Sequence, residues 1–180
     1  MLLKEFLKIA FLLFIVSIQS ACATDKLNVL DAILTENLTG FDKAIKNIKN
    51  PTFFTDEHGM KHNLLAAAAY SKNLEFTQRL IVAGADVRAE NQVGETALFD
   101  TIIACNIPAA KLLLQNGANP RHKNKMGLTP LHSAALSQCP GIVKLLISYG
   151  ADKNVKNTQG LTPYELALKM KNKPLVEQLK

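Results

Sequence analysis

The strongest constraint on the fold of this chain is a set of motifs that recur every 33 residues between Gly84 and Tyr164. Small-residue triplets begin at Gly84, Gly117 and Gly150, and a second glycine recurs at Gly94, Gly127 and Gly160. Motifs led by threonine follow at the same interval: Thr96-Ala97-Leu98, Thr129-Pro130-Leu131-His132 and Thr162-Pro163-Tyr164. Several motifs in one phase indicate a stack of like units, none of which buries its apolar face alone.

These motifs resemble the ankyrin repeat, a family with a period of about 33 residues and the signature T-P-L-H-x-A. The resemblance covers residues 57–180 and implies an all-α repeat fold. It predicts an ankyrin-repeat solenoid of stacked helix-turn-helix units with projecting finger loops. We number the expected repeats 1 to 4 in the order 57–90, 91–123, 124–156 and 157–180, the last being a C-terminal capping repeat.

Local residue chemistry agrees with this reading. Pro130 suits the first turn of a helix, because the N–H that it lacks would be unpaired there. Gly150 is placed to end the second helix of repeat 3, because glycine enters the left-handed conformation at little cost. The resemblance implies that the imidazole of His132 bonds to the backbone of the adjoining finger, which is a structural role.

The segment before the repeats is expected to cap the stack. Apolar residues spaced by three and four over 25–50 predict two short amphipathic helices, with Asn50-Pro51 ending the second. Residues 25–56 would then form a degenerate N-terminal capping repeat, followed by a longer first finger over 52–61. Residues 24–180 are therefore predicted to form a single domain.

Residues 1–23 have the features of a secretory signal peptide. The apolar run from Ile9 to Ile18 is too short to span a bilayer, and Ala21-Cys22-Ala23 forms a small-x-small cleavage pattern. A second reading makes Cys22 the lipidated cysteine of a lipoprotein, although Gln19 departs from that pattern. We expect a soluble periplasmic or secreted protein, with membrane attachment only if Cys22 is lipidated.

Charge and residue types limit the classes of function. The chain has 21 Lys and Arg against 15 Asp and Glu, a net charge of +6, which favours an acidic partner. Export argues against a nucleic-acid partner. No Ser-His-Asp spacing, phosphate loop or paired carboxylate stands out in the sequence. We therefore expect no enzyme activity and no cofactor.

Two groups of residues could carry other chemistry. Asp56-Glu57-His58 and His62 are potential metal ligands, but Gly59 and the finger context favour a solvated loop, so no metal site is predicted. Cys105 and Cys139 fall in the turns of adjacent repeats, displaced from equivalent positions by a single residue. Equivalent points in stacked repeats lie too far apart for a disulfide, yet the offset could close the gap. Both a bridge and two buried thiols remain open.

In the ankyrin family, finger tips and exposed positions of the first helices line a concave face that holds the partner. Carried onto this chain, the positions are Tyr70, Ser71, Gln92, Val93, Glu95, Ile103, Ala104, Lys125, Met126, Leu128, Leu136, Ser137, Thr158, Gln159 and Leu161. The apolar ones among them could form a binding patch or tuck between repeats. Seven cations are expected to surround the patch: Arg88, Arg121, His122, Lys123, Lys125, Lys153 and Lys156.

The sequence thus predicts a non-catalytic protein-binding module, monomeric apart from its partner. Small exported bacterial ankyrin proteins, which this chain resembles, are of two types. One type comprises immunity proteins that neutralise a secreted antibacterial toxin, and the other comprises accessory proteins that support a periplasmic enzyme. Analogy slightly favours immunity. A lipid-anchored membrane-surface protein is the alternative of a different class.

Overall fold

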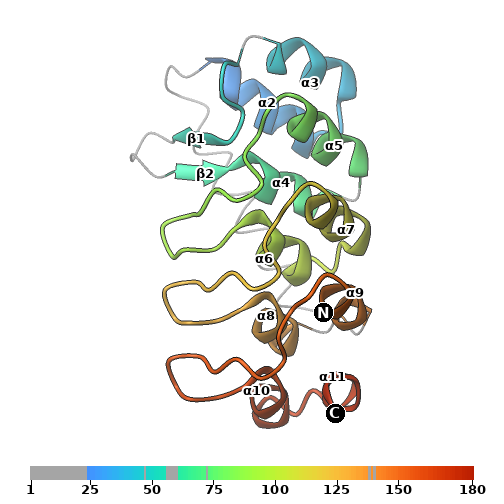
Figure 1. Cartoon of the computed structure of the whole chain (residues 1–180). Helices are drawn as coiled ribbons and strands as arrows, with labels where there is room; N and C mark the ends of the chain where they lie inside the picture. Colours follow the sequence, from blue (N-terminus) through green and yellow to red (C-terminus); the bar gives the residue numbers. More distant parts are fainter. Residues whose placement is uncertain (1–23, 47, 56–60, 72, 138, 140) are drawn as a thin grey trace.

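The computed structural model describes residues 24–46, 48–55, 61–71, 73–137, 139 and 141–180. Two columns of short helices run along the stack, and a row of finger loops projects to one side of them (Figure 1). The first helices of repeats 1 to 4 are α4 (Leu64–Tyr70), α6 (Ala97–Ile103), α8 (Pro130–Leu136) and α10 (Pro163–Lys169). The second helices are α5 (Leu74–Val82), α7 (Ile107–Gln115), α9 (Ile142–Ser148) and α11 (Lys173–Leu179). The structure therefore confirms the predicted stack of helix-turn-helix units.

The first helices begin where the repeat motif predicts. In repeat 4, the Thr162 N–H donates to Glu165 Oε2 (2.7 Å), while the Glu165 N–H donates back to Thr162 Oγ1 (3.3 Å). This reciprocal pair satisfies two N–H groups that the first turn of a helix leaves open. In repeat 1, where the sequence departs from the motif, Asn63 Oδ1 accepts the N–H of Leu65 at 2.8 Å. Asn63 thus performs the capping role of the missing threonine.

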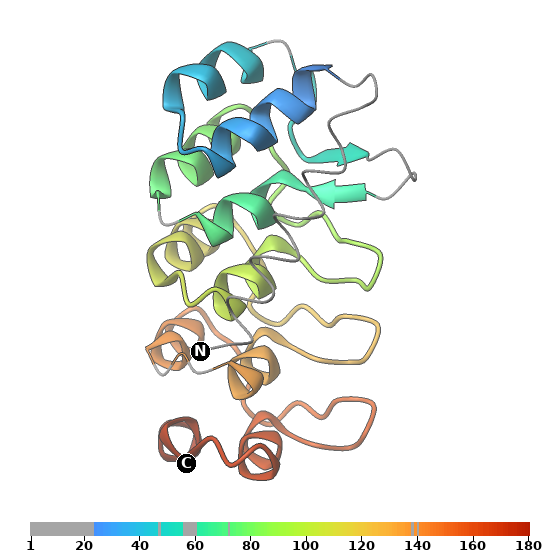
Figure 2. The same cartoon turned by 180° about the vertical axis from the view of Figure 1, so that it is seen from behind.

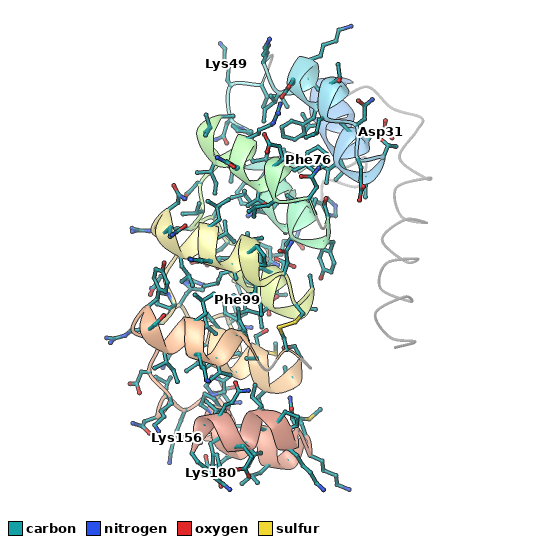
Figure 3. The ribbon with its side chains drawn as sticks, turned by 90° about the vertical axis from the view of Figure 1, so that its right-hand side faces the viewer. Asp31, Lys49, Phe76, Phe99, Lys156 and Lys180 are labelled. Carbon is teal, nitrogen blue, oxygen red and sulfur yellow. A yellow bond between two sulfur atoms is a disulfide. The ribbon has the colours of Figure 1, made fainter. Side chains whose placement is uncertain are left out.

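The core runs through the whole stack. Leucines at one position of the first helices, Leu65, Leu98 and Leu131, are each 0% exposed and belong to one continuous core cluster. Small residues on the same helices, such as Ala68 and Ala134, let adjacent first helices pack closely. Figure 3 labels the two large rings Phe76 and Phe99, which are fully buried. Burial of side chains of this size stabilises the fold by about 1.5–3 kcal/mol each.

Two helices cover the end of the stack next to repeat 1, as the view from behind shows (Figure 2). They are α2 (Thr24–Leu34) and α3 (Leu38–Ile45). Phe41 of α3 meets Phe76 edge to face, with ring centroids 5.1 Å apart. Asp42 of α3 also forms an ion pair with Arg79 of α5. The segment therefore packs onto the second helix of repeat 1.

Two details of this end differ from the sequence-based prediction. The second capping helix ends at Ile45, before Asn50-Pro51, because Pro51 restricts only the residue next to it. The first finger also contains two short strands, β1 (Phe53–Thr55) and β2 (Lys61–Asn63), which pair antiparallel with Phe53 opposite Asn63. The otherwise helical fold thus carries one small hairpin among the described residues.

The predicted signal peptide at 1–23, including Cys22, lies outside the described residues, as do Asp56, Glu57 and His58 of the metal candidate. His62 is described and lies on β2 opposite Phe54. No helix in the described part of the chain is both long enough and apolar enough to cross a bilayer.

Candidate functional site

The fingers owe their shape to an asparagine that recurs once in every repeat period. In each of three fingers its Oδ1 accepts the backbone N–H groups two and four residues later, at 2.9–3.0 Å. The glycine three residues after the asparagine has a positive φ, which closes the tip of the loop. The asparagines are Asn91, Asn124 and Asn157. The three tips therefore have the same conformation.

Adjacent finger tips are joined by backbone hydrogen bonds. The N–H of Lys125 donates to the Val93 carbonyl at 3.1 Å, and the N–H of Thr158 donates to the Met126 carbonyl at 3.2 Å. Asn124 Nδ2 also donates to Glu95 Oε1 at 3.0 Å. These bonds fix the spacing of the tips, so side chains on neighbouring fingers form an ordered row. We call the surface made by these tips and the first helices the finger-helix face.

Large apolar side chains are exposed on this face. Val93 and Met126 occupy equivalent tip positions and are 49% and 53% exposed, and Leu136 near the end of α8 is 50% exposed. Ile103, its equivalent on α6, is half-buried. Leu128 and Leu161 pack against the core instead. The exposed large apolar residues of this face are therefore Val93, Met126 and Leu136, which we call the apolar row, and Ile103 adds a half-buried side chain.

The other sequence-predicted positions differ in how much surface they offer. Four of them are exposed, namely Gln92, Lys125, Thr158 and Gln159. Four more are half-buried: Tyr70, Ser71, Glu95 and Ala104. Ser137 is only 8% exposed. A protein that docks on this face would therefore meet polar groups from the tips and apolar groups from both tips and helices.

Four of the predicted rim cations bond to backbone carbonyls, and three of these bonds join neighbouring repeats. Arg88 Nε donates to the Gly117 carbonyl at 2.8 Å, and Arg121 makes the same bond to Gly150, one repeat further along the chain. His122 Nε2 lies 2.7 Å from the Gly94 carbonyl, and Lys153 Nζ donates to the Lys180 carbonyl at 3.0 Å. The three remaining cations are exposed on the fingers: Lys123, Lys125 and Lys156.

One acidic group on a first helix has a strongly raised pKa. Burial, followed by the negative charge of Glu95, raises the pKa of Asp100 on α6 to about 7. Burial also raises the pKa of Tyr70 on α4 to about 12, and the charges of Asp100 and Glu95 add to this effect. In the repeat register Asp100 stands where the neighbouring repeats have Ala67 and Ser133, which are buried. The sequence analysis did not single out this residue, although the register could have revealed it.

Cys105 and Cys139 form a disulfide, with Cα atoms 5.4 Å apart. The one-residue offset between them closes the gap that would separate equivalent positions. The yellow bond in Figure 3 marks this link between the second and third repeats. Of the two alternatives that the sequence left open, the structure has the bridge.

The geometry agrees with a comparison against known protein families. The family described as "Ankyrin repeats (3 copies)" matches residues 64–157, which is over half of the chain. A comparison with curated proteins found no match. The matched segment begins at the first residue of α4, contains the fingers of Asn91 and Asn124, and ends at Asn157, the first residue of the third finger. This chain belongs to the ankyrin-repeat family.

Proposed function

We propose that the protein is an exported, non-catalytic module that binds another protein through its finger-helix face. Ankyrin repeats imply protein–protein interaction and are typically non-catalytic. The observation that carries the proposal is the exposed row of Val93, Met126 and Leu136 on a rigid, hydrogen-bonded support. Large apolar side chains held in water mark interaction sites, because their burial by a partner is favourable.

The chemistry of the partner follows from the charges around this row. Lys123, Lys125 and Lys156 are exposed on the two fingers that lead into α8 and α10, with no carboxylate bonded to them among the described contacts. They support a partner whose surface is acidic around an apolar centre. Charge of this kind speeds encounter, while apolar burial at the centre slows dissociation. We expect binding to weaken as salt rises, mainly through a slower association rate.

The Cys105–Cys139 disulfide supports export, because structural disulfides persist mainly in oxidising compartments. We place the protein in the periplasm or outside the cell, with residues 1–23 removed as a signal peptide. Mass spectrometry of the mature N-terminus distinguishes cleavage after Ala23 from lipidation at Cys22. A free N-terminus at Thr24 supports the soluble form, whereas a diacylated Cys22 would make the protein a membrane-surface binder.

Within this class, we retain immunity against a secreted antibacterial toxin as the first hypothesis and support of a periplasmic enzyme as the second. The two differ in the expected effect of deleting the gene. Loss of an immunity protein sensitises cells to a toxin from their neighbours. Loss of an accessory protein lowers one enzyme activity in cells grown alone.

Affinity capture with matched variants tests the binding surface. The changes Met126→Asp and Leu136→Asp place a charge in the apolar row. The controls Val82→Asp and Ile147→Asp place the same charge on the second helices, where Val82 is 82% and Ile147 41% exposed. We expect both row variants to lose a partner that both controls retain, with all four folded by circular dichroism. If the row variants retain the partner and the controls lose it, the binding site lies on the second helices and the proposal is wrong.

A further inference from the structure

One register position lies just before the second helix of every repeat. It is occupied by Asn73, Asn106, Cys139 and Asn172, each one repeat period from the next. The three asparagines cap their helices through Oδ1, which accepts a backbone N–H two or three residues later at 3.0–3.4 Å. Helix α9, which follows Cys139, has no side-chain cap. Repeat 3 therefore departs from its neighbours at this position.

Two of these asparagines also bind the preceding repeat. Asn106 Nδ2 donates to the carbonyls of Ala69 and Ser71 at 3.1 and 3.0 Å. Asn172 Nδ2 donates to Ala135 and Ser137 at 3.1 and 2.9 Å. Each amide thus links its own repeat to the C-terminal end of the preceding first helix, and we call this pair of hydrogen bonds the amide clip. A side-chain amide with two carbonyl partners is a specific link, since leaving buried carbonyls unpaired costs free energy.

Repeat 3 carries a covalent link at the place where its neighbours have this amide clip. By register, an amide at position 139 would reach the carbonyls of Ile102 and Ala104. Cys139 has no amide to donate to them, and it is instead bonded to Cys105, the residue directly after Ala104. Cys105 has a φ of +54° and Lys171, its equivalent in repeat 4, has +55°. The turn has the same conformation with and without the disulfide, so the link uses the ordinary backbone of the repeat.

We infer that the Cys105–Cys139 disulfide takes the place of the amide clip between repeats 2 and 3, so that the link between these repeats depends on the redox state of the two cysteines. In the reduced state Cys139 offers only a weak S–H donor, so this interface has neither the covalent link nor the amide link. The reductant is a dithiol. It supplies two electrons and two protons, the S–S bond breaks to give two thiols, and the dithiol closes into a cyclic disulfide. The amide clips of Asn106 and Asn172 contain no disulfide, so the dithiol does not change them.

The consequence for binding rests on the proposed function. The apolar row spans this interface, with Val93 in repeat 2 and Met126 and Leu136 in repeat 3. Reduction would loosen the two parts of the row relative to each other and so weaken partner binding. The loosening itself is a property of the isolated protein and is measured without a partner.

Hydrogen exchange and thermal unfolding of the purified protein test the clip. After reduction with dithiothreitol we expect a fall in Tm of roughly 5–15 °C. We also expect amide exchange in α8 and α9 to speed up by at least about tenfold, with α4 and α5 less affected. An unchanged Tm and unchanged exchange after complete reduction would overturn the inference.

A matched pair of variants separates the clip from a general effect of removing a crosslink. One carries Cys105→Ser with Cys139→Asn, which supplies the amide found in the other repeats, and the other carries Cys105→Ser with Cys139→Ser. Neither responds to dithiothreitol at this site. We expect the asparagine variant to melt at least about 3 °C above the serine variant, with slower exchange in α9. Equal melting and equal exchange in the two variants would show that position 139 holds no clip. If the serine variant does not fold while the asparagine variant does, the clip is supported, and the reduced wild-type protein provides the independent measurement.

Discussion

The Nε2 atom of His132 lies 2.9 Å from the carbonyl oxygen of Leu161, so the first helix of repeat 3 holds the finger of repeat 4. The Thr129 N–H donates to Nδ1 of the same ring at 3.1 Å. Because Nδ1 accepts this bond, the ring proton is on Nε2, which donates to Leu161. The contact that the family resemblance implied for His132 is confirmed, and the ring must be neutral to make both bonds.

This geometry predicts that part of the stability of the fold depends on pH. Burial, more than the nearby charge of Lys123, lowers the pKa of His132 below its ordinary value of 6.5. The unfolded chain therefore binds more protons, and stability falls as the pH decreases from about 6.5 through the lower folded pKa, by at most about 1.4 kcal/mol per pH unit. Urea denaturation at pH 7.5 and pH 5 measures the effect.

The control for this effect is His132→Gln. We expect it to cost about 2–3 kcal/mol at pH 7.5, because one buried polar network is lost. Its stability should also change less than that of the wild-type protein between the two pH values. A variant with the full wild-type pH dependence would show that other groups cause it.

Asp100 predicts an effect of the opposite sign. Its pKa is raised to about 7 in the folded state, above its unfolded value of about 3.9, so its contribution to stability is present at low pH and lost as the pH rises from about 4 through 7. We expect Asp100→Asn to stabilise the protein by about 1–2 kcal/mol at pH 8 and to have little effect at pH 4. The value at pH 8 is smaller than the pKa shift alone would give, because solvent reaches this half-buried group and screens its charge. Chemical denaturation at both pH values provides the measurement. As a control, Asp31→Asn changes an exposed residue on α2 and should alter the free energy of unfolding by no more than about 0.5 kcal/mol. An effect of Asp100→Asn no larger than that of the control would contradict the prediction.

The repeat register predicted much of this structure, for a physical reason. Stacked repeats place equivalent residues in equivalent surroundings, so Gly150 and His132 could be assigned roles from their phase alone. Residues whose role depends on a partner atom in the next repeat were harder to predict. The sequence placed Arg88 on the positive rim of the face, but it did not show that the guanidinium also donates to the Gly117 carbonyl in the next repeat. The sequence also could not decide whether the offset between Cys105 and Cys139 brings them together, because that depends on the path of the turn.

Two finger glycines provide a matched test of how closely the fingers pack. Gly127 and Gly160 both have positive φ, at +68° and +75°. A Cβ on Gly127 would lie 3.0 Å from the Thr158 backbone nitrogen, whereas a Cβ on Gly160 would meet nothing within 4 Å. We expect Gly160→Ala to cost about 1 kcal/mol from backbone strain alone and Gly127→Ala about 2–3 kcal/mol, because the next finger must also move. Equal losses in urea denaturation would mean that the fingers are not held against each other.

The most direct test of the binding face is a hydrogen-exchange footprint of the protein with its captured partner. We predict slower exchange in the finger tips over 92–95 and 125–128 and at the ends of α6 and α8. The second helices α7 and α9 should be unchanged. Protection confined to the second helices, with the finger tips exchanging as in the free protein, would contradict the account.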